Sequence, residues 1–205
     1  MKKQLILSAI AAVALGAPAA SMAESLDFNY KVDRFADIEV LRYKVPDFEQ
    51  LTIQQKELVY YLTEAALYGR DILTDQNGKY NLAIRTTLEN IYKNYDGSKD
   101  DADYKGFVLY LKQVWFANGI HHHYSTDKFT PQFSQAFFET QVKKLSKKQL
   151  PLKKGQTVDA FLKEITPVIF DPTVMAKRVN QANGQDLILT SANNYYEGVT
   201  QAEVE

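Results

Sequence analysis

The chain has 205 residues, a formal net charge of −1, 45% hydrophobic residues and no cysteine. This length and composition suffice for one domain with a real hydrophobic core. The slightly negative net charge does not favour binding to nucleic acid or to an anionic membrane. The lack of cysteine excludes disulfides and cysteine-ligated zinc.

The first 23 residues have the pattern of a secretory signal peptide. Two lysines follow the initiator, an apolar run covers residues 5–15, and a small-x-small tripeptide ends at Ala23. A membrane anchor is the alternative, but an apolar run of about 11 residues is short for a bilayer core that needs roughly 20. We expect an exported protein, periplasmic or secreted, whose mature part is residues 24–205 and has no membrane span after signal cleavage.

The mature part begins with extended structure and continues as helix. Residues 27–45 alternate aromatic or β-branched with polar residues, a pattern typical of strands. Thr52 and Gln55 form a possible capping box that begins a helix. Gly69 stands where this helix should end, at a position that often needs a positive φ.

Apolar residues that recur every three or four positions predict three further helices. The second helix begins near Asn81, and the third ends at Asn118 and Gly119. Thr130, followed directly by proline, predicts the N-cap of the next helix. Its apolar stripe consists of Phe133, Phe137 and Phe138.

The last fifty residues predict short elements. A helix begins at Thr157 and is broken by Pro167, a short helix lies between residues 172 and 183, and residues 186–190 form a possible strand. Thr200 begins another capping box, but the chain stops before a helix can form, which favours truncation over a frayed tail. The whole pattern predicts a mainly α fold with a few short β-strands.

The three histidines are consecutive, which argues against a metal site. Helical metal ligands are usually four residues apart, so that both side chains share one face. In an extended segment His121 and His123 would share a face, yet the only nearby carboxylate is Asp127, which a loop would have to bring closer. We therefore expect no metal ligand in this chain.

Other catalytic patterns are also absent from the sequence. It contains no His-Glu-x-x-His, Gly-x-Ser-x-Gly, P-loop or Gly-x-Gly-x-x-Gly motif. Its carboxylates have the placement of helix-surface charges, although a glycosidase pair among them is an alternative. We expect no catalytic residue here.

Residues 118–125 form an unusual polar and aromatic connection between two predicted helices. Gly119 allows a close approach of the backbone to a ligand, and loops on rigid helices often carry binding residues. The alternative is a partly buried connector whose histidines bond to the backbone.

Several long segments resemble one enzyme family. They are Phe35–Val45, Lys56–Leu62, Glu64–Ile72, Asn118–Ser125 with Asp127–Phe129, and Ala192–Gly198. These segments are similar to the N-terminal region of bacterial dipeptidyl peptidase III enzymes, and the resemblance covers nearly all of the mature chain.

The resemblance implies part of one lobe of a two-lobed α+β zinc metallopeptidase that releases dipeptides from the N-termini of oligopeptides. In that family the zinc is held by a His-Glu-x-x-Gly-His helix and a later glutamate, and neither motif occurs here. The implied zinc therefore belongs to the full-length parent, and the partner of this chain is a missing C-terminal catalytic region of the same polypeptide. Alone, the chain is expected to hydrolyse nothing.

The resemblance also implies a substrate-binding role for Asn118, His123, Tyr124 and Ser125, as one wall of the cleft between the lobes. The alternatives are a non-catalytic peptide-binding module and an interaction protein of the cell envelope. An interaction protein would use the apolar stripe defined above as its contact face.

Overall fold

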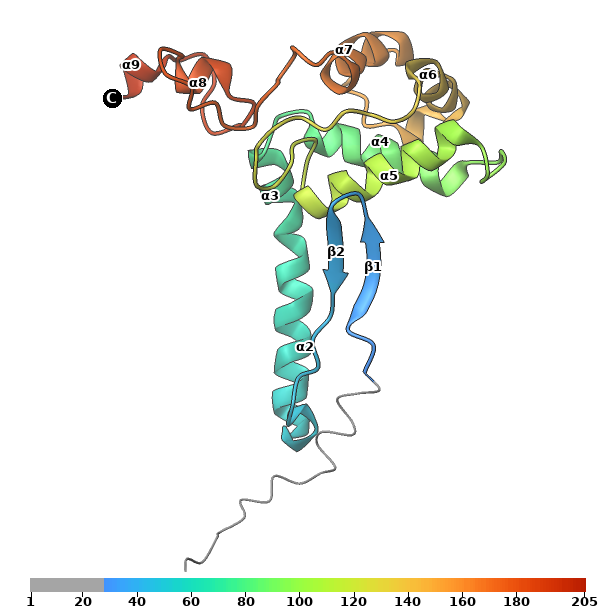
Figure 1. The fold of residues 1–205 in the computed structure, drawn as a ribbon, viewed down its shortest axis with the longest axis vertical. Helices are drawn as coiled ribbons and strands as arrows, with labels where there is room; N and C mark the ends of the chain where they lie inside the picture. The colour runs from blue at the N-terminus through green and yellow to red at the C-terminus, as the bar shows by residue number, and fades with distance from the viewer. Residues whose placement is uncertain (1–27) are drawn as a thin grey trace, which may run out of the picture. The chain divides into compact units, whose positions relative to one another are not determined.

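The computed structural model describes residues 28–205, so the predicted signal peptide lies outside the described residues. The described residues form two compact units, 28–50 and 51–205. In the described part the first unit holds one antiparallel pair of strands, and the second unit is helical (Figure 1). The prediction of a mainly α fold with a few short strands is confirmed.

The described part of the first unit is a β-hairpin. Strand β1 (Lys31–Phe35) pairs with β2 (Ile38–Leu41), and Phe35 lies opposite Ile38 across a tight turn. Ala36 has a φ of 47° in that turn. A short 3-10 helix, η1 (Phe48–Gln50), follows. The predicted extended segment is therefore present as two strands.

The second unit consists of helices of very different length. They are α2 (Ile53–Tyr68), α3 (Arg70–Gln76), α4 (Asn81–Asn94), α5 (Ala102–Ala117), α6 (Gln135–Lys144), the 3-10 helix η2 (Lys147–Gln149), α7 (Val158–Phe170), α8 (Leu187–Thr190) and α9 (Gln201–Val204). The predicted capping box begins α2: the Thr52 hydroxyl accepts the Gln55 N–H at 3.3 Å, and the Gln55 side chain accepts the Thr52 N–H at 2.9 Å. Gly69 has a φ of −71°, so the expected left-handed cap is wrong and α3 follows directly.

Helices α4 to α7 enclose the hydrophobic core of the second unit. Figure 1 shows α4 and α5 side by side, with α6 next to α7. The most deeply buried side chains recur at helical spacing: Ile84, Leu88 and Ile91 in α4, Phe107, Leu111 and Val114 in α5, Phe138 and Val142 in α6, and Leu162, Ile165 and Ile169 in α7. Burying each large apolar side chain contributes ~1.5–3 kcal/mol.

The predicted apolar stripe is part of this core. Phe138 is 0% exposed and Phe133 is 6% exposed. The Phe133 ring packs on Phe107, with 5.7 Å between centroids, where the chain crosses Gly106 of α5. A Cβ at Gly106 would lie 1.8 Å from a backbone oxygen of the crossing segment. The stripe is thus not a free contact face, which contradicts its expected role in an interaction protein.

Helix α6 begins four residues later than the sequence predicts. Its N-cap is Ser134, whose hydroxyl accepts the Phe137 N–H at 3.1 Å, and not Thr130. Asp103 of α5 fixes this position. Its carboxylate accepts two hydrogen bonds from Ser134, one from the backbone N–H at 2.7 Å and one from the side-chain hydroxyl at 2.8 Å. A side chain from another helix therefore decides between two possible caps.

Helix α7 begins at its predicted N-cap, Thr157, but it does not break at Pro167. The helix continues to Phe170, so the proline removes one N–H donor from the last turn without ending the helix. The ammonium of Lys128 donates to the carbonyls of Val168, at 3.0 Å, and Asp171 at this end of the helix. A half-buried cation next to free helix carbonyls stabilises the C-terminus.

Several predictions for the C-terminal segment are wrong. Residues 172–183 form turns and bends instead of a helix, and residues 186–190 form no strand. The Asp186 carboxylate accepts the N–H groups of Ile188 and Leu189, both at 2.9 Å, and so nucleates the single turn α8. The capping box at Thr200 is present and begins the single turn α9, so the expectation that no helix can form after Thr200 is wrong.

Candidate functional site

The loop of residues 118–128 begins at the C-terminal end of α5. Asn118 is the C-cap of that helix in a left-handed conformation, with a φ of 52°. Gly119 follows with a φ of 150°, and a Cβ there would lie 2.3 Å from the amide nitrogen of Asn81. Only glycine fits this position without displacing Asn81, because both the conformation and the close approach exclude a side chain.

Two buried asparagines hold the start of the loop. Asn77 donates its side-chain amide to the carbonyl of Asn118 at 3.1 Å. Asn81, which is 1% exposed, accepts the N–H of Ile120 at 3.3 Å and donates to the Thr74 carbonyl at 3.3 Å. These bonds satisfy backbone groups that would otherwise be buried without partners. The loop is thus attached to α3 and α4 as well as α5.

The far end of the loop lies between two other extended segments. His122 donates its N–H to the Asp127 carbonyl at 2.8 Å, and Arg178 donates its N–H to the Thr126 carbonyl at 2.8 Å. Residues 176–178 therefore pair with the returning arm of the loop, and residues 192–193 in turn donate to residues 177–178. An ion pair of 2.6 Å between Lys177 and Asp127 adds to this contact and, with the Ser125 hydroxyl, lowers the pKa of the Asp127 carboxyl.

His121 is a structural residue of the loop base. It is 2% exposed, and its Nε2 lies 2.7 Å from the Met175 carbonyl, so Nε2 carries the proton. Its Nδ1 is buried and has no hydrogen-bond partner among the described residues. Burial lowers the pKa of His121 to about 4, so the imidazole is neutral at pH 7.

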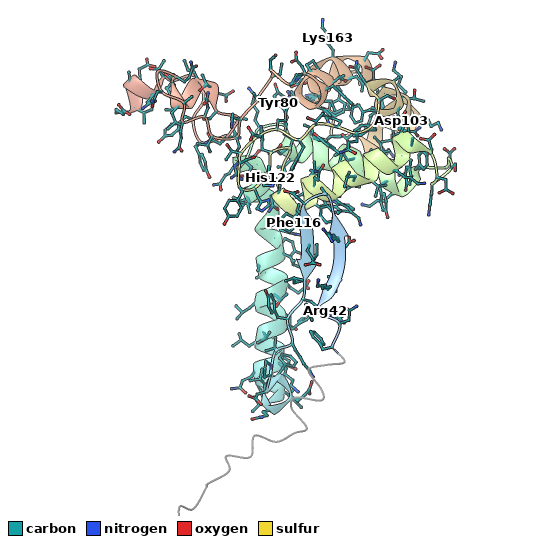
Figure 2. All side chains as sticks on the ribbon, viewed as in Figure 1. Arg42, Tyr80, Asp103, Phe116, His122 and Lys163 are labelled. Atoms are coloured by element: carbon teal, nitrogen blue, oxygen red, sulfur yellow. The ribbon has the colours of Figure 1, made fainter. Side chains whose placement is uncertain are left out.

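His122 shapes the exposed tip of the loop. Its Nδ1 accepts the N–H groups of Tyr124, at 3.2 Å, and Ser125, at 3.1 Å, which fixes a tight turn. Thr126 closes the turn with a φ of 63°, an uncommon conformation for a β-branched residue. Figure 2 shows His122 and Phe116 near the same end of α5. Strained backbone of this kind is concentrated at functional sites.

His123 and Tyr124 form an aromatic tip. The His123 ring lies 5.1 Å from the Phe116 ring and 5.4 Å from the Tyr124 ring, edge to face in both cases. Tyr124 is 85% exposed. The Ser125 hydroxyl accepts the Asp127 N–H at 3.3 Å. The tip therefore presents ring faces and polar groups to solvent on a well-anchored base.

The structure thus places three of the four predicted binding residues together. His123, Tyr124 and Ser125 are consecutive at the tip, whereas Asn118 is half-buried at the helix cap and lines a separate pocket. Sequence reasoning missed Asn81 and Arg178, whose guanidinium donates to the His123 carbonyl at 3.2 Å. Their partners are 39 and 55 residues away, and the sequence carries no signal of such pairing.

The histidines do not fit a zinc site. His121 points to a carbonyl, and Nδ1 of His122 is occupied by two backbone N–H groups. Among residues 28–205 no group of three or more histidine, aspartate or glutamate side chains is arranged to hold a metal ion. In the same range no helix is long and apolar enough to cross a bilayer. The arrangement is suited to binding through rings and backbone groups.

Neither the protein-family models nor the curated proteins identify a relative. The resemblance to dipeptidyl peptidase III stays a prediction from the quoted segments.

Proposed function

We propose that this chain is the N-terminal part of a zinc-dependent exopeptidase that releases dipeptides from the N-termini of oligopeptides. In this proposal the loop of residues 118–128 is one wall of the peptide cleft. The zinc and the general base come from a C-terminal catalytic region of the same polypeptide. The observation that carries the proposal is the exposed aromatic tip at residues 123–125, within a segment that resembles the family.

The tip has the chemistry that an extended peptide needs. Tyr124 offers an exposed ring for apolar contact, and the surrounding backbone can pair with a peptide main chain. The base of the loop is held by residues at the end of α3, in α4, at the end of α5 and in the segment 176–178. A rigid base reduces the conformational entropy that a ligand must remove on binding.

Helix α2 supports the idea that another part of the polypeptide is needed. None of its residues is buried. Its large apolar side chains are at least 43% exposed: Ile53, Leu58, Val59, Tyr60, Tyr61, Leu62, Leu67 and Tyr68. These side chains lie among charged residues such as Lys56, Glu57 and Glu64, and a large exposed apolar patch marks a contact surface. We infer that the catalytic region covers it.

The same exposed helix also favours the alternative function. In that case the chain is a non-catalytic peptide-binding or interaction module of the cell envelope, and another protein covers α2. The two functions share the tip and differ in the source of the covering surface.

Peptide binding by the full chain tests the role of the tip. We expect an alanine hexapeptide to bind in a calorimetric titration, and Tyr124→Ala to weaken the affinity at least about fivefold, or ~1 kcal/mol. Tyr68→Ala is a matched control, because Tyr68 is 84% exposed and lies on α2. An equal effect of the two substitutions, or no binding by the native chain, would contradict the proposed role.

We also propose that the protein is exported. The support is the sequence pattern of residues 1–23, which lie outside the described part of the chain. N-terminal sequencing of the protein from a cell that exports it should give a chain that begins at Glu24. A cytoplasmic protein that retains residues 1–23 would contradict the proposal.

A further inference from the structure

A second concave site lies beside the candidate loop, at the C-terminal end of α5. The pocket has a volume of ≈ 490 Å³ and is formed by α3, α4 and α5. Three basic side chains, one carboxylate, two aromatic rings and Asn118 line it. It is therefore mixed in character, with a cationic side and an aromatic side.

The fixed cation of the pocket is Arg85. Its side chain is 18% exposed, and its guanidinium donates to the Thr74 hydroxyl at 3.0 Å and pairs with Asp71. Its Nε is buried without a hydrogen bond to any described residue and lies 3.7 Å from a carboxylate oxygen of Glu89. These contacts hold the guanidinium in one orientation.

Arg70 and Lys93 supply cations at the pocket surface. Within the described residues, the only hydrogen bond of the Arg70 guanidinium runs from Nε to the Leu67 carbonyl, at 3.2 Å. Lys93 lies 4.0 Å from Glu89. Among the described residues, Glu89 lines the pocket and Asp71 pairs with Arg85, so the three cations are set against two carboxylates and the pocket retains a positive excess. Arginine presents its terminal N–H groups as a fork that matches a carboxylate.

The opposite side of the pocket is aromatic. Trp115 is 42% exposed, and its indole N–H donates to Glu89 at 2.9 Å, which fixes the ring. Tyr92 is 44% exposed and lies edge to face with Trp115 at 6.1 Å. Exposed, fixed aromatic rings bind apolar side chains at a low entropic cost.

We propose that this pocket binds the C-terminal end of a peptide. The terminal carboxylate would pair with Arg70 and Lys93, and an apolar or aromatic last side chain would pack on Trp115. Asn118 lines the pocket and also begins the candidate loop, so one peptide can extend from the tip into the pocket. The inference rests on the proposed function only for the choice of a peptide as the ligand.

The single tryptophan of the chain makes the test direct, because Trp115 reports on this pocket alone. The full chain is titrated with alanyl-alanyl-phenylalanine, and separately with the same peptide amidated at its C-terminus, while tryptophan emission is recorded. We expect a saturable change with the free acid and at least about tenfold weaker binding of the amide. Arg70→Gln should abolish this preference, whereas Lys163→Gln, on α7 and outside the pocket, should preserve it.

The outcomes separate this inference from the proposed function. Equal binding of acid and amide, or an unchanged preference in Arg70→Gln, overturns the carboxylate site. If Tyr124→Ala then still weakens the binding of both peptides, the loop keeps its proposed role, but the pocket does not bind a carboxylate. A preference for the acid, together with affinities for both peptides that Tyr124→Ala leaves unchanged, supports the pocket and contradicts the role of the tip. No binding of either peptide overturns both.

Discussion

Gly119 is the residue on which the path of the candidate loop depends most. Two features exclude a side chain at this position: the φ of 150°, and the contact of 2.3 Å that a Cβ would make with Asn81. We expect Gly119→Ala to lower the free energy of unfolding by about 3 kcal/mol or more, because the side chain must displace a buried, bonded asparagine. Urea denaturation of the full chain measures this cost.

Gly155 provides the matched control for this substitution. It has a φ of 78°, but a Cβ there would meet nothing within 4 Å. Gly155→Ala should therefore cost only the backbone strain, ~1 kcal/mol. Equal costs for the two substitutions would show that the close approach to Asn81 does not constrain the loop.

His121 should make stability depend on pH. Its pKa falls from an ordinary value of 6.5 to about 4 in the folded chain, so between these values the unfolded chain binds more protons. The contribution is fully present above about pH 6.5 and is lost as the pH falls towards 4, with a loss of ~2 kcal/mol between about pH 7.5 and about pH 5.

Comparison of variants isolates this effect from other titrating groups. We expect His121→Gln to lose less stability than the native chain between about pH 7.5 and about pH 5, by urea denaturation at each pH. His123→Gln, at an exposed position, should behave like the native chain. The same pH dependence in all three proteins would contradict a neutral, buried His121.

At the scale of elements, two leucines on different helices should respond very differently to truncation. Leu58 of α2 is 58% exposed, and Leu88 of α4 is 0% exposed. Leu88→Ala should lower the free energy of unfolding by ~2–5 kcal/mol through a core cavity, whereas Leu58→Ala should change it by less than about 0.5 kcal/mol. Urea denaturation tests both. A large cost at Leu58 would mean that α2 is already covered in this chain, which would remove one support for a missing partner region.

The elements show where sequence reasoning succeeds. The capping boxes at Thr52 and Thr200 and the N-cap at Thr157 involve only residues three positions apart, so local sequence determines them. The long helices α4 and α5 follow from a repeated apolar spacing that buries one face.

Two of the wrong predictions have a different cause, which is a partner from elsewhere in the chain. Asp103 selects Ser134 over Thr130 as an N-cap, and Lys128 stabilises the end of α7 beyond Pro167. Neither contact can be inferred from the local pattern. The same holds for the candidate site: the tip is recognisable as an unusual segment, but its anchors and the neighbouring pocket depend on residues distant in sequence.

At the scale of the whole molecule, each of the two units contains an element that lacks packing partners within the described part of its own unit. The hairpin of the first unit is a sheet of two strands, which is marginally stable alone, and α2 of the second unit has no buried residue. Both features are expected of a portion of a larger protein whose remaining elements complete the sheet and cover the helix. The proposed catalytic region would supply them.

The reading frame that follows codon 205 in the encoding DNA tests the central claim most directly. We predict that the frame continues through a His-Glu-x-x-Gly-His motif and a later glutamate-rich motif, which together would provide the zinc ligands and the general base. A stop codon directly after Glu205, with no such motif downstream, would contradict the claim and would leave a non-catalytic peptide-binding module as the better account.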